Sequence, residues 1–325
     1  MNSPIQLNMH THSRFAGRYK LSVHKEKSGT IVTHTGWFNT LITYQGLDQI
    51  GNPPVFNTVN GYPYINTHCA VGTGTTPPAL TDTAMEAQVA MFPSTAGGNV
   101  NGGANSYVAA SGPTPAYYRC VWVYTFAAGT ATGNLSEVGV GGTLNGDTTP
   151  RLFSHALIVD GSGNPTTITV LSDEVLTVTY ELRLYIDPTD SSYSFFINTT
   201  SYSGTVRRSI IATAANIDFS VQNTPSGVIY IQCYNGSIGT VTGGPSGSGD
   251  SSNAYDEVSQ FAYVTGNYYR DFRRSIPISI ANINISALQT RSPHGRWQFS
   301  VSPAIPKTSS VSLQLNWRQS WGFYP

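Results

Sequence analysis

Apolar and polar residues alternate along many short stretches of this chain, and this period of two limits its fold more than any other feature. Alternation places apolar side chains on one face of an extended strand. The stretches are rich in Val, Ile, Thr, Tyr and Phe, which favour strands. The clearest ones are 19–25, 29–38, 117–126, 174–186, 226–234, 276–286 and 310–317. Turn-forming residues such as those of 160–165 separate them, which predicts an all-β fold with sandwich architecture.

Helical patterns are scarce. Residues 41–50 fit one short amphipathic helix that ends before Gly51, and residues 81–91 fit a helix or a strand equally well. We therefore expect little helix.

Six sequence landmarks occur twice in the same order, which indicates an internal duplication. The pairs are Tyr19 and Tyr193, Cys69 and Cys233, Tyr117-Tyr118-Arg119 and Tyr268-Tyr269-Arg270, Asn134-Leu135-Ser136 and Asn284-Ile285-Ser286, 151–154 and 296–300, and Val178-Thr179-Tyr180 and Leu315-Asn316-Trp317. The prediction is an N-terminal arm (1–14) followed by two tandem, jelly-roll-like β-sandwich modules, 15–188 and a diverged copy 189–325. The alternative is that strands rich in Tyr, Ser, Gly and Thr align without common origin. Two loops, 96–111 and 243–253, are rich in small polar residues, and we expect them to be mobile.

Low charge favours association with other proteins. Only 10% of the residues are charged and the net charge is zero, whereas ordinary domains carry about 25% charged residues. A partner bound through phosphates is disfavoured, because the basic residues cluster only at Arg207-Arg208 and at Arg270, Arg273 and Arg274. No run approaches the roughly 18 apolar residues of a membrane span, and residues 1–12 lack the pattern of a secretory signal. Three cysteines, Cys69, Cys120 and Cys233, lie in strand patterns as buried free thiols.

No complete catalytic or metal-binding motif occurs. Gly72-Thr73-Gly74 and 139–142 lack the spacing and Lys of a phosphate loop. Metal ligation could come from His10 and His12, from Asp160 and Asn164, or from Asp250, Asp256 and Glu257, but none of these sets is complete and turn chemistry explains the acidic ones better. The prediction is a protein with no catalytic residues, cofactor or metal, although carboxylates distant in sequence could still meet in space as in glycosidases.

Aromatic residues crowd the C-terminus. Trp321, Phe323 and Tyr324 lie beyond the predicted strand that ends at Trp317, where a monomer would expose them. They are the candidate interface residues, and the alternative is that the tail folds back on its own module. Two further tyrosine groups fit either sugar-binding platforms or packed strands: Tyr263, Tyr268 and Tyr269, and Tyr117 and Tyr118.

Five segments, 35–51, 69–85, 134–142, 151–158 and 174–186, together resemble a family of bacteriophage virion proteins of the tail, collar or minor structural type. The piece VGTGTTPPALTDTA (71–84) is the most specific, and the second module departs from the pattern. The resemblance implies assembly into a particle and brings no catalytic residues.

The expected function is therefore a non-enzymatic structural component of the phage tail, neck (collar) or fibre. It would be made in the bacterial cytoplasm and located in the virion. Expected partners are further copies, in a trimer or hexamer-type ring, and other virion proteins, with no nucleic acid or membrane. The alternatives are a receptor-binding or carbohydrate-binding virion protein that contacts a host surface glycan, a capsid decoration protein and, last, a glycan-cleaving enzyme.

Overall fold

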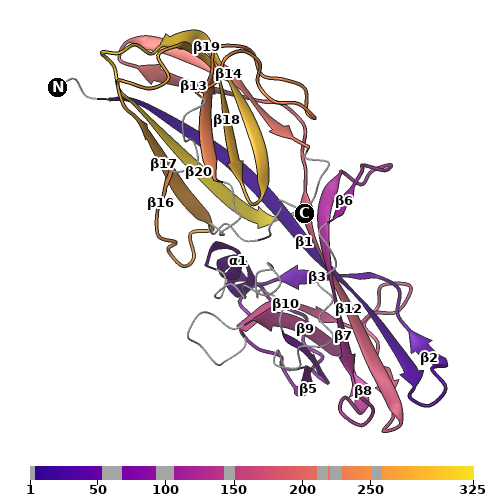
Figure 1. Ribbon diagram of the computed structural model, residues 1–325. Helices are drawn as coiled ribbons and strands as arrows, with labels where there is room; N and C mark the ends of the chain where they lie inside the picture. Colours follow the sequence, from indigo (N-terminus) through magenta and orange to yellow (C-terminus); the bar gives the residue numbers. More distant parts are fainter. Residues whose placement is uncertain are drawn as a thin grey trace. The chain divides into compact units, whose positions relative to one another are not determined.

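The computed structural model describes residues 4–52, 68–92, 106–142, 151–210, 219, 229–250 and 258–325. It is nearly all β, with 59% strand and 3% helix, so the predicted all-β class is confirmed (Figure 1). The chain divides into two compact units. Unit 1 comprises Met1–Ser13, Tyr107–Tyr117 and Tyr185–Trp321, and unit 2 comprises Arg14–Ser106, Tyr118–Leu184 and Gly322–Pro325.

These units differ from strictly tandem modules because they interleave along the chain. Tyr185 lies near the predicted boundary at 188, but the first strand, β1 (Ile5–Lys25), gives its beginning to unit 1 and its remainder to unit 2. The predicted N-terminal arm is thus a strand from Ile5 onward. Its alternation continues without a break, with every second residue from Leu7 to Val23 buried.

Unit 2 is built on antiparallel pairs. Its strands follow the order β1–β3–β10–β9–β4–β5, while β12 pairs with β1 and β7, β2 pairs with β1, and β8 pairs with β11. The elements are β2 (Ile31–His34), β3 (Phe38–Ile42), α1 (Tyr44–Gly51), β4 (His68–Gly72), β5 (Gln88–Phe92), β7 (Tyr117–Phe126), β8 (Gly133–Leu135), β9 (Glu137–Gly142), β10 (Arg151–Leu157), β11 (Ile168–Val170) and β12 (Glu174–Tyr185). The short strand β6 (Ser106–Val108) begins in unit 2, and its other two residues belong to unit 1.

Unit 1 contains a five-stranded sheet in the order β13–β14–β19–β18–β15 and a second group in the order β16–β17–β20–β1. Figure 1 shows β14, β18 and β19 side by side in the first sheet. The elements are β13 (Ser191–Ile197), β14 (Thr200–Ser209), β15 (Tyr230–Tyr234), β16 (Val258–Gln260), β17 (Tyr269–Ile276), β18 (Asn284–Ser292), β19 (Gly295–Pro306) and β20 (Leu313–Phe323).

The strand orders of the two units correspond. The run β1–β3–β10–β9–β4 of unit 2 matches β13–β14–β19–β18–β15 of unit 1, and β12 beside β7 matches β20 beside β17. Most of the paired landmarks fall on matching strands, with Cys69 in β4 and Cys233 in β15. The pair Asn134-Leu135-Ser136 and Asn284-Ile285-Ser286 does not, because the first lies on β8 and the residue after it and the second on β18. One landmark is out of register, because Tyr118 is buried whereas Tyr269 is half-buried on the outer face.

Aromatic side chains fill the core of each unit. In unit 2 the Tyr180 ring lies 4.9 Å from that of Tyr19 and 5.9 Å from that of Trp122. In unit 1 the Trp317 ring lies 4.9 Å from that of Phe272 and 5.9 Å from that of Trp297. Tyr180 and Trp317, which end one pair of landmarks, therefore hold central positions in both cores.

The structure confirms some of the predicted local elements and contradicts others. The helix expected within 41–50 forms as α1, where the Thr43 hydroxyl accepts a hydrogen bond from the backbone N–H of Gly46 at 3.0 Å. Within 81–91, the segment that fitted a helix or a strand, only residues 88–91 belong to a regular element, and they form the beginning of β5. The single strand expected over 276–286 is wrong: β17 ends at Ile276 and β18 begins at Asn284. Pro277 cannot donate to a strand ladder, which explains the break.

The two loops expected to be mobile are only partly described. Residues 96–105 lie outside the described residues, and 106–108 form β6. In the second loop, 251–253 lie outside the described residues, whereas 243–250 are tied to unit 1 by hydrogen bonds. The Ser246 N–H donates to the Ser237 carbonyl at 2.9 Å, and the Asp250 N–H donates to the Cys233 carbonyl at 3.1 Å.

Candidate functional site

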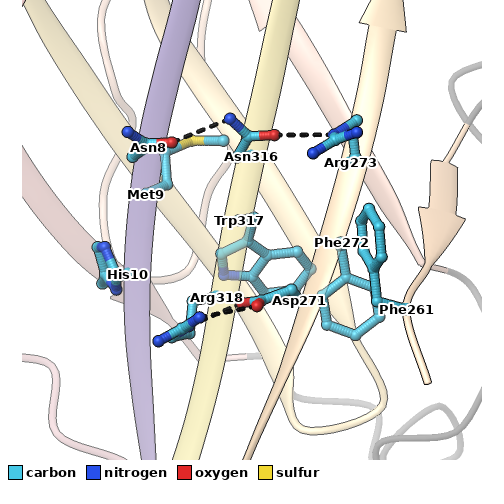
Figure 2. A pocket seen from close by; sticks show the side chains of 10 residues that line it. All are labelled: Asn8, Met9, His10, Phe261, Asp271, Phe272, Arg273, Asn316, Trp317 and Arg318. Atoms are coloured by element: carbon cyan, nitrogen blue, oxygen red, sulfur yellow. Dashed lines mark hydrogen bonds and ion pairs between the residues drawn. The ribbon is translucent and has the colours of Figure 1, made fainter. Parts of the chain in front are cut away.

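A polar groove crosses the outer face of three neighbouring strands of unit 1, β1, β20 and β17 (Figure 2). Its volume is about 380 Å³, within the usual range of small-molecule pockets. Strand alternation builds it: Met9, Phe272 and Trp317 are buried below the sheet, and the residues between them point outward. The outward lining residues are Asn8, His10, Asp271, Arg273, Asn316 and Arg318, joined by Phe261 just after β16.

Hydrogen bonds hold the lining side chains in two rows across the strands (Figure 2). In the first row, Asn316 Nδ2 donates to Asn8 Oδ1 at 2.9 Å, and Arg273 Nε donates to Asn316 Oδ1 at 3.1 Å. In the second row, Arg318 Nε and Nη2 donate to the two carboxylate oxygens of Asp271 at 2.7 and 2.8 Å. The rows coincide with the strand register, in which Asn316 pairs with Arg273 and Arg318 with Asp271.

Aromatic rings flank both arginines of the groove. The Arg273 guanidinium lies 4.9 Å from the centre of the Phe261 ring, and that of Arg318 lies 3.6 Å from the centre of the Tyr269 ring. Phe261 is 41% exposed. Hydrogen bonding to Asp271 raises the pKa of Arg318 above its ordinary value, and the Asp271 side chain is the ion-pair partner of this guanidinium.

The tyrosines proposed as sugar platforms take other positions. Tyr117 and Tyr118 are buried in the core, and Tyr263 packs on Trp321 with ring centres 5.7 Å apart. Tyr269 borders the groove but lies beneath Arg318. The sequence analysis did not nominate Phe261 as a site residue. The feature that could have indicated it is an apolar residue that shortly precedes the exposed turn 264–267.

The basic run of unit 1 is split by strand alternation. Arg270 and Arg274 are buried, whereas Arg273 points outward into the groove. Arg274 forms an ion pair with the buried Asp250, whose second carboxylate oxygen accepts a hydrogen bond from the Cys233 N–H at 3.0 Å. These three arginines therefore do not form one basic patch.

The three candidate interface residues differ in burial. Trp321 is only 2% exposed and lies inside β20, where its backbone N–H donates to the Tyr268 carbonyl at 2.9 Å. The expectation that Trp321 lies beyond the last strand is wrong, because β20 continues past Trp317 to Phe323. Phe323 and Tyr324 are half-buried, and only these two keep exposed surface.

A buried carboxylate in unit 2 anchors the loop between β4 and β5. Glu137 is fully buried and accepts hydrogen bonds from the backbone N–H groups of Gly74, Glu86 and Ala87 at 3.1, 3.1 and 2.7 Å. A Cβ on Gly74 would lie 2.7 Å from the Glu137 carboxylate, so glycine permits this close approach. The Gly72-Thr73-Gly74 segment thus wraps around a protein carboxylate.

His155 extends this cluster. Its Nε2 lies 2.9 Å from Glu137 Oε2 and its Nδ1 lies 2.8 Å from Asp82 Oδ2. The ring nitrogens are thus engaged by carboxylates of the same chain, and the cluster connects the loop to β9 and β10.

The other candidate ligands have structural partners or lie apart. Asp160 Oδ1 accepts hydrogen bonds from the N–H groups of Ser162 and Asn164 at 2.8 and 3.0 Å, as in an Asx turn, and these bonds lower the pKa of Asp160. His12 Nδ1 lies 2.8 Å from Ser320 Oγ. Asp256 and Glu257 lie outside the described residues. Across the described ranges, no group of three or more His, Cys, Asp and Glu side chains is arranged to hold a metal ion.

Comparisons with protein-family models, with curated proteins and with solved structures find no match to this chain. The resemblance to phage virion proteins therefore rests on the sequence segments alone. Within the described ranges, no helix has the length and apolar character needed to cross a membrane.

Proposed function

We propose that this protein is a non-enzymatic structural subunit of a bacteriophage particle, in the tail, neck or fibre, and that it assembles from two copies of one duplicated module. The observation that carries the proposal is the matching strand order of the two units. A repeated module suits a ring, because a trimer would present six similar positions and a hexamer twelve.

Matched hydrogen bonds support the duplication. The Tyr19 hydroxyl donates to the Ser154 carbonyl at 3.3 Å, and the Tyr193 hydroxyl donates to the Ser300 carbonyl at 2.7 Å. In the same way, Ser136 Oγ donates to the carbonyl of Gly74 at 2.8 Å, and Ser286 Oγ donates to the carbonyl of Gly236 at 2.6 Å. Strand alternation alone does not require polar interactions of this kind, so their repetition favours common origin over compositional similarity.

The surface offers a place for assembly contacts. β5 ends its sheet among the described strands, and Val89 and Met91 on it are 43% and 39% exposed. End strands with exposed apolar residues pair readily with other chains. Because few charges oppose association, we expect this edge to contact a second copy or another virion protein.

Purified particles provide the test. Mass spectrometry should detect the protein in stoichiometric amounts, and a cryo-EM map should place both units in a symmetric ring. Met91→Lys should reduce the assembled fraction in light scattering, while Lys20→Met, which changes an exposed residue of β1, should not. A protein that is monomeric and absent from particles would contradict the proposal.

Binding of a host surface glycan is the second candidate function, and the groove of Figure 2 favours it. Its amide, guanidinium and carboxylate groups are planar hydrogen-bonding partners for sugar hydroxyls. Phe261 supplies an exposed ring face at its edge. Retention of the purified protein on host polysaccharide, with loss on substitution of lining residues, would support this role.

A further inference from the structure

Among the described residues that line the groove, Arg273 is a cation that forms no ion pair. The carboxylate of Asp271 is engaged by both Nε and Nη2 of Arg318. Among the described residues, Arg273 donates one hydrogen bond, from Nε to Asn316, and forms no ion pair. The side chain is exposed, and one positive charge therefore stands at this end of the groove.

The guanidinium of Arg273 is already oriented. Asn316 accepts a hydrogen bond from its Nε, and its Cζ lies over the Phe261 ring, 4.9 Å from the ring centre. Asn316 is itself held by Asn8 and by Gln314, whose Nε2 donates to Asn316 Oδ1 at 3.1 Å. The two terminal nitrogens of Arg273 form no hydrogen bond with the described residues, and a planar guanidinium fork matches a carboxylate in two parallel hydrogen bonds.

The remaining lining suits a polyhydroxylated ring. Asn8 and His10 come from β1, and the Arg318–Asp271 pair, with the two side chains 39% and 38% exposed, offers donors and acceptors on the adjacent row. Sugar hydroxyls both donate and accept, so they can satisfy such a mixed set. The C–H face of a sugar ring packs on an aromatic ring such as Phe261.

We propose that the groove binds a carboxylate-bearing sugar of a polysaccharide, with the carboxylate on Arg273 and the ring against Phe261. This inference rests on the second candidate function, glycan binding, and adds the chemical class of the glycan. A neutral sugar would leave Arg273 without a counter-charge, whereas an acidic sugar supplies one and gains charge-assisted hydrogen bonds.

Titration calorimetry on the full chain tests the proposal. The probes are tetrasaccharides of glucuronate, galacturonate and mannuronate, each beside its methyl ester, which keeps the ring and removes the charge. At least one acid should bind roughly tenfold or more tightly than its ester, since bidentate charge-assisted hydrogen bonds are worth this much. Arg273→Gln should abolish that difference, and Phe261→Ala should weaken both forms.

Two matched variants control for charge and for exposed aromatic surface. Arg14→Gln removes an exposed arginine of unit 2, and Phe196→Ala removes a phenylalanine of β13 that is 71% exposed. Neither residue lines the groove, so both variants should bind the saccharides as tightly as the unaltered chain does. Circular dichroism should show that all four variants are folded.

The contrary results distinguish failure of the acidic-sugar proposal from failure of glycan binding. Equal binding of acid and ester would overturn the acidic class while leaving glycan binding intact. Binding of no saccharide would overturn both the inference and the second candidate function, and incorporation into particles would still be decided separately. Equal binding of inorganic phosphate and of the uronates would show a general anion site and would also overturn the inference.

Discussion

Tyr193 reaches across a whole strand to donate its hydroxyl hydrogen to the carbonyl of Ser300 at 2.7 Å. Tyr193 lies on β13 and Ser300 on β19, with β14 between them. The close approach requires glycine opposite the tyrosine, because a Cβ on Gly204 would lie 2.8 Å from the Tyr193 ring. In unit 2, Tyr19 spans β3 to reach Ser154 on β10 in the same way.

We expect Tyr193→Phe to lower the free energy of unfolding of unit 1 by about 1 kcal/mol, because it loses its hydrogen bond to the Ser300 carbonyl. Tyr19→Phe should lower that of unit 2 by at least as much, because the Tyr19 hydroxyl also hydrogen-bonds Ser154 Oγ at 2.8 Å. Chemical denaturation with fluorescence detection measures both. Tyr202→Phe, on a buried tyrosine of β14, serves as the control. A crystal structure in which 15–188 and 189–325 share fewer than half of their strands in order would refute the duplication itself.

Asp250 and Asp190 provide a comparison between buried and exposed ion pairs in unit 1. Asp250 is buried with Arg274; burial raises the pKa of its carboxyl, while the Arg274 charge opposes that shift. We expect Asp250→Ala to cost about 3–5 kcal/mol, because it leaves the Arg274 charge buried alone. Asp190→Ala breaks a pair with Arg207 whose side chains are 39% and 25% exposed, and it should cost less than about 1 kcal/mol. Similar losses of unfolding free energy in the two variants would contradict this account.

Glu137 should determine the stability of the loop that links β4 to β5. In Glu137→Gln, an amide NH₂ faces backbone N–H donors, and each donor left unsatisfied costs about 1–3 kcal/mol. Limited proteolysis should then cut within 73–87 faster than in the unaltered chain. Glu86→Gln is the control: Glu86 accepts hydrogen bonds from Thr75 and Thr76 at an exposed position, and its loss should have a smaller effect on cleavage.

His294 should make stability dependent on pH in the acid range. Burial, with the nearby Arg208 charge, lowers the pKa of His294 to about 3, against an ordinary value of about 6.5. The unfolded chain therefore binds a proton below about pH 6.5 that the folded chain excludes until about pH 3. The stabilisation is complete above pH 6.5 and decreases by up to about 1.4 kcal/mol per pH unit through this window.

Replacing His294 by Gln should flatten that slope in denaturation curves recorded between pH 3 and 7. The exposed His34 supplies the control, and His34→Gln should keep the original slope. An unchanged slope in His294→Gln would show that other groups cause the dependence.

Trp321 should behave as a core residue. Its ring lies 5.7 Å from that of Tyr263 and 6.2 Å from that of His294, so Trp321→Ala should cost about 3–5 kcal/mol of unfolding free energy. Tyr324→Ala, at a half-buried position, should cost clearly less. Deleting 320–325 would cut β20 and should destabilise unit 1, contrary to the expectation that this segment is a separable interface tail. Thermal unfolding of the three variants decides between these roles.

The sequence by itself determined the all-β class, the position of α1 and the order of the paired landmarks. These are local properties: the period of two, the cap at Thr43 and the turn residues are set by neighbours in the chain. The same pattern placed Trp317 on the inward face of its strand, whereas the strands that hold Met9 and Phe272 were not predicted.

Only the tertiary structure decided the partners of those strands. The sequence pattern did not indicate a core strand at residues 5–13, because the polar residues Thr11 and Ser13 occupy inward positions. Both are buried beside β20, where Trp317 Nε1 donates to Thr11 Oγ1 at 2.8 Å and Gln319 Nε2 donates to Ser13 Oγ at 3.1 Å. A polar residue is stable at an inward position only when a partner satisfies it, and here the partner lies 306 residues away in sequence. The groove that joins Asn8 to Asn316 and Arg273 depends on the same long-range pairing.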